Sequence, residues 1–444
     1  MTSNPVADSE SLRALLVSYN FPPVGGAGVA RVVKLAKFLP EYGIRPAVLT
    51  VANPSVPVVD ESRLRDLPPE IDIIRARTLE PGYGAKRAAW SAQAVSTPSL
   101  RHRAVLAASS LAKQALIPDP QILWQPAAQL ALLRRLVGRS TNQVIFISGP
   151  PFSQFLLALT AQLNPKVAVV LDYRDEWSTY GSNYEMRGSL GVRVGGWLEE
   201  TVVKVPDAIT TATEGFREHL LERFPRLEPS RVVTISNGYD PDDFPSELPL
   251  PPTDRFVVTY AGTVFRLTSL RGFVGAVRRL WSHKPDLARL LEVRIVGRVV
   301  ETEEDYLKDA AELGIVRVGY VPHDQVPLEL ARSHVTLCVL DDTPGVERIY
   351  PAKIFEQMYL RRPSLTLSPP GALTELVDRT QLGEVLPPRD ESKICAWLEA
   401  RLMAHQRGES LVPPQPIGIE AYHRRALAGR FAEVFRAAHR RAAH

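Results

Sequence analysis

The sequence predicts an α/β protein of two successive domains, each with a parallel sheet flanked by helices. Short apolar runs of the kind found in buried parallel strands alternate with amphipathic helical segments along most of the chain. One proline- and aspartate-rich segment, 236–252, interrupts this alternation and is typical of a linker. The 444 residues, 45% of them hydrophobic, are enough to form two buried cores.

The first half begins with a strand–loop–helix–strand unit. Residues 14–18 form an apolar strand, a glycine-rich loop follows over 19–28, and a helix covers 29–42 before the next strand at 46–51. A further helix is predicted over 152–163. Further strands are predicted at 144–148, 167–171, 208–211 and 232–235.

The second half repeats the alternation after the linker. Strands are predicted at 256–260, 291–296, 316–318, 335–340 and 364–367, and helices at 269–281, 303–313, 327–331 and 352–360. The final segment, 419–442, is predicted to be a long basic helix suited to pack back across the domain junction.

The charge balance argues against a nucleic-acid-binding protein, since 53 basic and 49 acidic residues give a net charge of only +4. One region, 85–140, is strongly basic, with Asp119 as its single acid. Its basic residues are Lys86, Arg87, Arg101, Arg103, Lys113, Arg134, Arg135 and Arg139. The region is either a solvated helical surface or a patch that meets an anionic membrane surface or acceptor, where each cation gains about 1 kcal/mol.

Cysteine content and hydropathy indicate the compartment. The chain has two cysteines, which is too few for a disulfide framework, and we expect a reducing environment. The first thirteen residues lack the apolar core of a signal peptide, and no run of 18 apolar residues occurs. We therefore expect a cytoplasmic protein with no transmembrane span.

Candidate binding residues follow the predicted strands, because ligands of open α/β sheets bind at the carboxyl ends of the strands. Gly25, Gly26 and Gly28 follow the first strand and allow backbone amides to approach a phosphate, although a plain strand–helix turn has the same composition. Arg266 and Arg298 follow two strands of the second half. Each is either a forked ligand for a diphosphate or a surface arginine.

The segment 348–358 carries the strongest local signal. Pro351 suits the first turn of a helix, where the N–H groups near Ala352 and Lys353 are available to phosphate oxygens. Glu356, one turn further, can accept hydrogen bonds from both hydroxyls of a ribose. The alternative is a solvated helical surface.

Eight motifs together resemble the family-4-type, or group 1, glycosyltransferases of the GT-B fold, and the resemblance covers nearly the whole chain. The motifs are PPVGGAG (22–28), GPPFS (149–153), LDYRDEW (171–177), ISNGYDPDDF (235–244), YAGT (260–263), RIVGR (294–298), GYVPHDQVP (319–327) and YPAKIFEQMYLRRPSLTL (350–367). Their order and spacing are more specific than any one of them.

The resemblance implies two Rossmann-like domains that face a cleft. Residues 1–240 would form the acceptor-binding domain, 253–415 the nucleotide-sugar-binding domain, and 416–444 a C-terminal helix that crosses back to the first domain. The implied reaction transfers a sugar from a nucleoside-diphosphate sugar, most commonly a UDP-sugar, with retention and with neither a metal nor another cofactor. The implied acceptor is a sugar-containing or lipid-linked molecule of envelope polysaccharide or glycolipid synthesis, and the protein would work in the cytoplasm or at the inner membrane face.

The resemblance also implies roles for individual residues. Glu356 would hold the ribose, and Asp175 would face the acceptor. Catalytic roles are implied for Asp175, Arg266 and Lys353. The implied donor-binding residues are Gly25, Gly26, Thr263, Arg266, Arg298, Tyr320, Val321, Ala352, Lys353 and Glu356, with Lys353, Ala352 and Arg266 at the diphosphate, Gly25 and Gly26 closing over it, and Tyr320 and Val321 at the base.

Two positions depart from the family pattern. The common motif has a glutamate eight residues before Glu356, where this chain has Arg348, and a lysine five residues after Arg266, where it has Arg271. These departures leave open a non-catalytic GT-B partner protein. Another GT-B enzyme, such as a nucleotide-sugar epimerase or a phosphorylase, also remains as an alternative.

Overall fold

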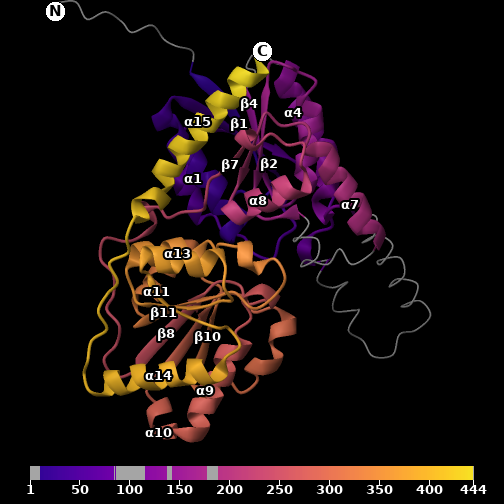
Figure 1. Ribbon diagram of the computed structural model, residues 1–444. Coiled ribbons are helices and arrows are strands. Elements are labelled where there is room, and N and C mark those ends of the chain that lie inside the picture. The colour runs from indigo at the N-terminus through magenta and orange to yellow at the C-terminus, as the bar shows by residue number, and fades with distance from the viewer. Residues whose placement is uncertain (1–10, 85, 87–115, 138–142, 178–188, 444) are drawn as a thin grey trace, which may run out of the picture. The chain divides into compact units, whose positions relative to one another are not determined.

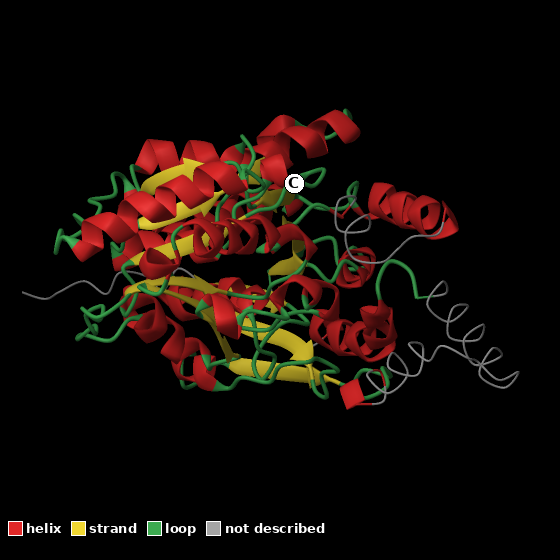
Figure 2. Ribbon diagram, turned by 90° about the horizontal axis from the view of Figure 1, so that it is seen from below, coloured by secondary structure: helices red, strands yellow, loops and turns green. Residues whose placement is uncertain are grey.

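The computed structural model describes residues 11–84, 86, 116–137, 143–177 and 189–443. The chain divides into two compact units. The first contains Met1–Ile235 and Leu427–His444, and the second contains Ser236–Ala426. Each unit has one parallel sheet with helices on both faces, which confirms the predicted α/β class (Figures 1 and 2).

The first unit contains a seven-stranded parallel sheet in the order β3-β2-β1-β4-β5-β6-β7. Its strands are β1 (Leu12–Val17), β2 (Ile44–Val51), β3 (Asp72–Ala76), β4 (Val144–Gly149), β5 (Ala168–Tyr173), β6 (Ala208–Thr211) and β7 (Val232–Thr234). The central strands are buried along their length, as their apolar sequences predict. The strand order reverses between β1 and β4, which pair directly with Leu16 opposite Phe146.

Helices cover both faces of this sheet, with α1 and α15 on one side and α4 on the other (Figure 1). Its described α-helices are α1 (Ala30–Phe38), α4 (Gln125–Val137), α5 (Leu157–Ala161), α7 (Ser189–Val202), α8 (Glu214–Arg223) and α15 (Arg424–Ala442). Helix α15 buries Phe431 and Phe435 against Phe146 of β4, with ring centroids 5.5 and 5.4 Å from the Phe146 ring. The last helix is therefore part of the first unit's core.

The basic character of α15 has a structural use. Arg430 donates to the Thr234 carbonyl at 2.7 Å, Arg441 donates to the Asp207 carbonyl at 2.9 Å, and Arg436 donates to the Tyr42 carbonyl. Several charges of this helix are therefore engaged in fixing it to the sheet.

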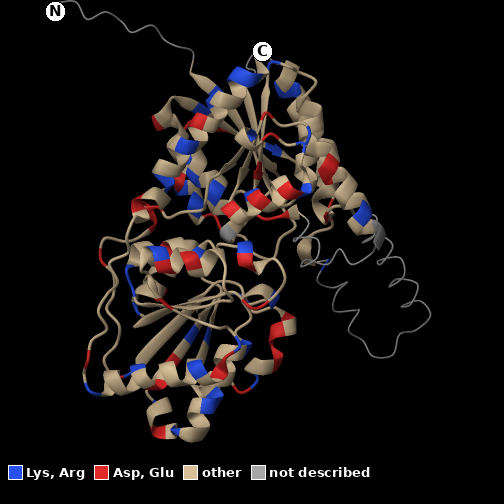
Figure 3. Cartoon of the chain, viewed as in Figure 1, with Lys and Arg blue, Asp and Glu red and all other residues tan. Residues whose placement is uncertain are grey.

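Both signs of charge are interspersed over each unit (Figure 3).

The second unit contains a six-stranded parallel sheet in the order β10-β9-β8-β11-β12-β13. Its strands are β8 (Phe256–Ala261), β9 (Leu291–Val296), β10 (Ile315–Gly319), β11 (Val335–Val339), β12 (Ser364–Leu367) and β13 (Gly383–Leu386). Its helices are α9 (Arg271–His283), α10 (Pro285–Ala288), α11 (Val326–Ala331), α12 (Lys353–Leu360), α13 (Ala372–Thr380) and α14 (Glu391–Gln406). Helices α9 and α14 lie on one side of the sheet, and α11 and α13 on the other (Figure 1).

The structure differs from the predicted elements at a few places. The edge strands β3 and β13 are additional, and their short, half-exposed sequences carry no clear apolar alternation. The helix predicted over 303–313 is a series of short 3₁₀ turns, Glu301–Glu303, Asp305–Leu307 and Ala311–Leu313. These turns bury Tyr306, Leu307 and Leu313 against the sheet, so apolar burial is achieved without a continuous helix.

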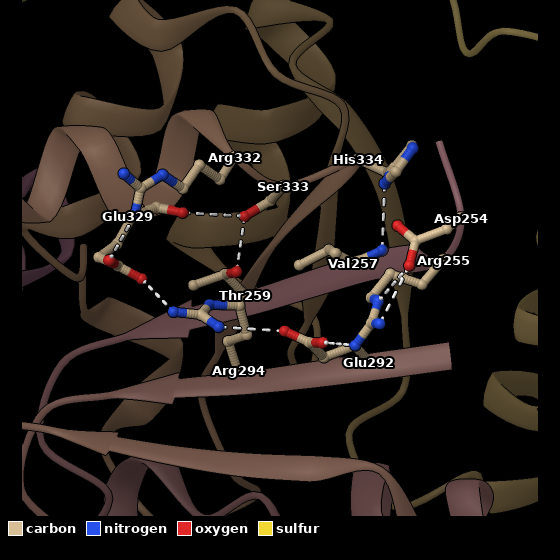
Figure 4. A network of polar contacts seen from close by, with 10 residues as sticks. All are labelled: Asp254, Arg255, Val257, Thr259, Glu292, Arg294, Glu329, Arg332, Ser333 and His334. Carbon is tan, nitrogen blue, oxygen red and sulfur yellow. Dashed lines mark hydrogen bonds and ion pairs between the residues drawn. The ribbon is translucent and has the colours of Figure 1, made fainter. Parts of the chain in front are cut away.

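A polar network ties α11 to the sheet of the second unit (Figure 4). Arg294 on β9 donates to Glu292 at 3.0 Å and to Glu329 of α11 at 2.6 Å. The Ser333 hydroxyl donates to Thr259 on β8 at 2.6 Å. The network pairs both Arg294 Nη groups, although the buried Arg294 Nε has no hydrogen-bond partner among the described residues.

His334 at the end of this network joins β8 to β11 in its neutral form. Its Nδ1 accepts from the Val257 N–H at 3.0 Å, and its ring stacks on Phe256 with a centroid separation of 5.0 Å. Burial lowers the pKa of His334 and, together with the smaller effects of the neighbouring charges of His405 and Arg362, brings it to about 4.

The pKa of His334 predicts a stability loss in acid. Between about pH 6.5 and about pH 4, His334 is protonated in the unfolded chain and neutral in the folded chain. The free energy of unfolding therefore falls as the pH is lowered through this window. We expect His334→Asn, which keeps an acceptor for the Val257 N–H, to flatten this dependence. Melting temperatures of both proteins between pH 4 and 7.5 measure it, and parallel curves would contradict the assignment to His334.

Candidate functional site

Both sheets have a point where the strand order reverses, and this is where open α/β sheets bind ligands. In the first unit, it lies between β1 and β4, followed by the loops at Gly25–Gly28 and Gly149–Pro151. In the second unit, it lies between β8 and β11, and the loop after β11 leads into α12. The predicted site residues therefore fall into two groups, one in each unit.

In the first unit, Arg174 holds the glycine-rich loop against the loop after β4. Its guanidinium donates to the carbonyls of Gly28 and Pro150, and its Nε donates to the Gly149 carbonyl at 3.2 Å. A side chain at Gly28 would lie 3.2 Å from the same guanidinium. Gly26 has a φ of 101°, a region that L-residues rarely adopt, and open space surrounds it.

Beneath this loop lies a buried ion pair between Arg31, the second residue of α1, and Asp172 on β5. The Arg31 Nε and Nη2 donate to the two Asp172 oxygens at 2.9 and 2.7 Å. Ser148 and Thr210 also donate to Asp172, at 2.6 and 2.7 Å, and Arg31 donates to the Ile235 carbonyl at 2.8 Å. Both side chains of the pair are almost fully buried, so the network fixes the start of α1 to three strands.

Asp175 lies just beyond β5, one residue after Arg174. Desolvation raises the pKa of its carboxyl, while the neighbouring Arg174 opposes the increase and Glu176 adds to it. A carboxyl with a raised pKa is suited to proton transfer, and its predicted role near the acceptor stays a prediction.

In the second unit, two glycines bring the loops after β8 and β9 together. Gly262 and Gly297 have φ values of 140° and 134°, and the Gly262 N–H donates to the Val296 carbonyl at 2.8 Å. A Cβ at Gly297 would lie 2.2 Å from the Gly262 carbonyl oxygen. No other residue fits this contact, so both glycines are required for the loop geometry.

This contact places Arg266 and Arg298 on adjoining loops. The Val264 N–H donates to the Arg298 carbonyl at 2.8 Å, and Arg266 follows two residues later. Both arginine side chains are exposed, and neither has a hydrogen bond or ion pair within the described residues. Two guanidinium groups are therefore available at the carboxyl edge of this sheet.

Lys353, the first residue of α12, is the most unusual group of this edge. Its Nζ is buried, lies 3.7 Å from the centroid of the Tyr260 ring, and has no hydrogen-bond partner among the described residues. A Cβ at Gly262 would lie 2.9 Å from the same nitrogen. A buried ammonium without an acceptor is costly, and a bound anion would supply the missing partner.

Glu356 lies in the first turn of α12, partly buried and without an ion pair in the described chain. Ala352 precedes the helix as its cap. The N–H groups of Ile354 and Phe355 donate to the carbonyls of Pro351 and Ala352, at 3.1 and 3.4 Å, whereas those of Ala352 and Lys353 donate to no described residue and remain available to a ligand. Arg348, which stands in place of the family's first glutamate, is paired with the adjacent Glu347. The sequence-predicted anion and ribose ligands thus share one helix N-terminus.

The remaining predicted donor residues lie at the same edge of the second unit. Thr263 is exposed, and its carbonyl accepts from the hydroxyls of Tyr260 and Thr268, each at 2.8 Å. Tyr320 and Val321 directly follow β10, with Tyr320 43% exposed and Val321 partly buried. Their predicted contact with a base stays a prediction.

Sequence reasoning missed Tyr260, Arg31 and Asp172. Tyr260 lies in the YAGT motif and Asp172 in LDYRDEW, so both were quoted without a role. Their partners, Lys353 and Arg31, are 93 and 141 positions away in the chain. Only the folded sheet brings such residues together.

The structure also bears on the basic region, on membrane-spanning helices, on metal sites and on the cysteines. Of the basic region 85–140, only Lys86, Arg134 and Arg135 lie among the described residues, and Lys86 and Arg135 are paired with Glu80 and Asp72. Within the described ranges, no helix is both long enough and apolar enough to cross a membrane, and no group of three or more His, Cys, Asp or Glu could hold a metal ion. Cys338 and Cys395 are buried free thiols.

Comparison with known proteins identifies related sequences. A model of the glycosyl transferase 4-like domain matches residues 25–238. An alpha-maltose-1-phosphate synthase from Mycolicibacterium smegmatis is 30% identical over 111 residues, which are 23% of this chain and 28% of that protein. A D-inositol 3-phosphate glycosyltransferase from Stackebrandtia nassauensis is 34% identical over 128 residues, 26% of this chain and 29% of that protein. The matches thus span less than a third of either relative.

Solved structures extend the likeness to the whole fold. Sucrose-phosphate synthase from Thermosynechococcus elongatus aligns with a TM-score of 0.64 and 13% identity, covering 96% of this chain and 98% of that one. Anabaena HepE in complex with UDP and glucose aligns with a TM-score of 0.55 and 15% identity, covering 94% of this chain and 95% of that one. At these identities the likeness concerns the fold.

The buried pair beneath the glycine loop predicts a large stability effect. Arg31→Met leaves the Asp172 carboxylate buried without its cation, and we expect a loss of about 3–5 kcal/mol. Arg231→Met, which removes an exposed ion pair with Glu228 in the same unit, is the matched control and should cost less than about 1 kcal/mol.

Urea unfolding of the full chain measures the free energy of unfolding of both variants. The double variant Arg31→Met/Asp172→Asn should recover part of the stability that Arg31→Met loses, because the unpaired buried charge is gone. Equal costs for Arg31→Met and Arg231→Met would show that the buried pair does not hold α1 in place.

Proposed function

This chain belongs to the family-4-type glycosyltransferases with the GT-B fold, and from that premise we propose that it transfers a sugar from a nucleoside-diphosphate sugar to an acceptor. The second unit binds the donor, and the first unit, which carries the matched glycosyl transferase 4-like domain, binds the acceptor. The donor is a UDP-sugar. HepE, which shares the fold, was solved with UDP and glucose, in line with this choice.

The observation that carries the proposal is the buried, unpartnered ammonium of Lys353. It lies at the start of α12, where the helix N-terminus also favours an anion. Exposed Arg266 and Arg298 add two further cations at the same sheet edge. A diphosphate is the ligand that matches three cations and free backbone N–H groups at once.

The remaining donor contacts follow from the positions of the side chains. Glu356, one turn into α12, accepts from the ribose hydroxyls, and a carboxylate can accept on both oxygens. Tyr320 and Val321 flank the base, and Thr263 and Ala352 contribute at the phosphates. In the first unit, Gly25 and Gly26 are proposed as further donor-binding residues. Open space surrounds Gly26, and the Gly25 N–H donates to the Val58 carbonyl at 3.0 Å.

The chemistry requires stabilisation of the leaving nucleoside diphosphate while the sugar carbon acquires positive charge. Lys353, Arg266 and the N-terminus of α12 neutralise the charge that develops on the leaving phosphate. Asp175 faces the acceptor, and the raised pKa of its buried carboxyl is typical of a functional site. We propose transfer with retention and without a metal, with the leaving phosphate itself assisting acceptor deprotonation.

The proposed acceptor is a sugar-containing or lipid-linked molecule of glycoconjugate or envelope polysaccharide synthesis, met at the inner membrane face. The basic residues of the region 85–140 support this proposal, and exposed Arg134 lies on α4 with exposed Leu130 and Val137. Co-sedimentation with vesicles containing anionic lipid, compared with neutral vesicles, tests the membrane contact. Equal sedimentation with both would remove it.

The donor proposal predicts nucleotide-selective stabilisation. UDP at 100 times its dissociation constant should raise the free energy of unfolding by about 2.7 kcal/mol, measured by thermal shift and calorimetry against GDP, ADP, dTDP and CMP.

Lys353→Ala should lower turnover at least tenfold, since about 1.4 kcal/mol of phosphate stabilisation accounts for a factor of ten. Glu356→Ala should abolish the selective stabilisation.

Matched controls come from the same unit. Lys308→Ala and Glu312→Ala change exposed residues away from the sheet edge and should leave nucleotide binding as it is. No response to any nucleotide would favour the non-catalytic partner protein. Epimerisation of the donor in the absence of an acceptor would favour the epimerase.

A further inference from the structure

The Lys353 ammonium is held by an aromatic ring instead of an acidic partner. Its Nζ lies 3.7 Å from the centroid of Tyr260, well within the distance at which an aromatic face attracts a cation. The two residues come from different elements, β8 and the start of α12. A ring at this place accounts for how a buried ammonium is retained although no described residue accepts a hydrogen bond from it.

The ring of Tyr260 is fixed in place. Its side chain is fully buried, and its residue pairs with Ile295 on one neighbouring strand and Leu337 on the other. Its hydroxyl donates to the Thr263 carbonyl at 2.8 Å, so the ring is anchored at both ends of its long axis. A fixed ring gives the cation one position instead of a range of them.

Gly262 leaves room for the end of the lysine. A Cβ at this position would lie 2.9 Å from the Lys353 Nζ, 3.3 Å from its Cε and 3.5 Å from the Tyr260 hydroxyl. The missing side chain therefore leaves the space in which the end of the lysine lies. The Tyr260 ring and the Gly262 backbone together form the seat of the ammonium.

We propose that Tyr260 is a positioning residue, which holds the Lys353 ammonium at the anion site while leaving its charge uncompensated. An aspartate or glutamate at this distance would hold the cation equally well, but it would neutralise the charge and compete with a ligand. An aromatic face attracts the cation without occupying its N–H donors in that way. The inference rests on the proposed function in one respect, namely that the anion is the diphosphate of the donor.

The first experiment tests the seat in the ligand-free protein. A methylene group above an aromatic ring experiences a ring-current shift, so we expect the Lys353 Hε resonances to be displaced upfield. The displacement should persist in Tyr260→Phe and vanish in Tyr260→Leu. Unshifted resonances in the unaltered protein would overturn the inference without reference to any nucleotide.

The second experiment is a double-mutant cycle on UDP binding by calorimetry. Tyr260→Leu should weaken binding by roughly twofold to thirtyfold, the range that corresponds to measured cation–π attractions. Tyr260→Phe, which keeps the ring, should restore most of that affinity. In a Lys353→Met background, Tyr260→Leu should have no further effect, whereas a purely structural role would weaken binding in both backgrounds.

The matched control is Phe256→Leu, which truncates another fully buried ring on the same strand, stacked on His334 and without a contact to Lys353. It should lower stability without changing the dissociation constant for UDP. Replacement of Tyr260 by phenylalanines with one, two and three ring fluorines provides a series that keeps ring size and folding. Affinity should fall stepwise with fluorination because each fluorine weakens the negative ring face.

The outcomes separate the two proposals. A ring-current shift without binding of UDP or any other nucleoside diphosphate would uphold the seat and overturn the donor proposal. UDP binding that is equal in the unaltered protein, Tyr260→Leu and the fluorinated series would overturn the role of Tyr260 and uphold the donor proposal.

Discussion

Both units depend on a constraint of parallel sheets, namely that all strands end at one edge and the loops separate where the strand order reverses. At that edge, chain segments far apart in the sequence come into contact without any extra element. Arg174 contacts the Gly28 carbonyl, 146 positions away, and Lys353 contacts the Tyr260 ring. The position of each candidate site is thus a property of the topology, and the side chains decide only its chemistry.

The two units use their charges at this edge in opposite ways. In the first unit, the cations are engaged, since Arg31 is bound to Asp172 and Arg174 to three backbone carbonyls. These contacts stabilise loops, and they leave little charge for a ligand. In the second unit, Arg266 and Arg298 are exposed without partners in the described chain, and Lys353 is buried without an acceptor. This difference supports the proposal of an anion site in the second unit.

The sequence predicted the features that depend on local patterns. Apolar runs located the central strands, and Pro351 indicated a helix N-terminus that carries Lys353 and Glu356, where the structure has them. It did not predict the edge strands β3 and β13, which are half-exposed and pair with one neighbouring strand each, or the broken helix at 303–313. It also could not predict that Tyr260 would lie beneath Lys353, because that contact depends on how α12 packs on β8 and not on either local sequence.

The choice of an aromatic partner for Lys353 also has a consequence for stability. A lysine paired with a buried carboxylate would be satisfied in the folded chain, and a ligand would first have to displace that carboxylate. A lysine over a ring is only partly compensated, so the folded chain retains an electrostatic cost that a bound anion removes. The free energy released when that cost disappears adds to the affinity for the ligand. In the proposed site, the second unit would therefore be less stable without the anion and would bind the anion more tightly, as expected of a preorganised site.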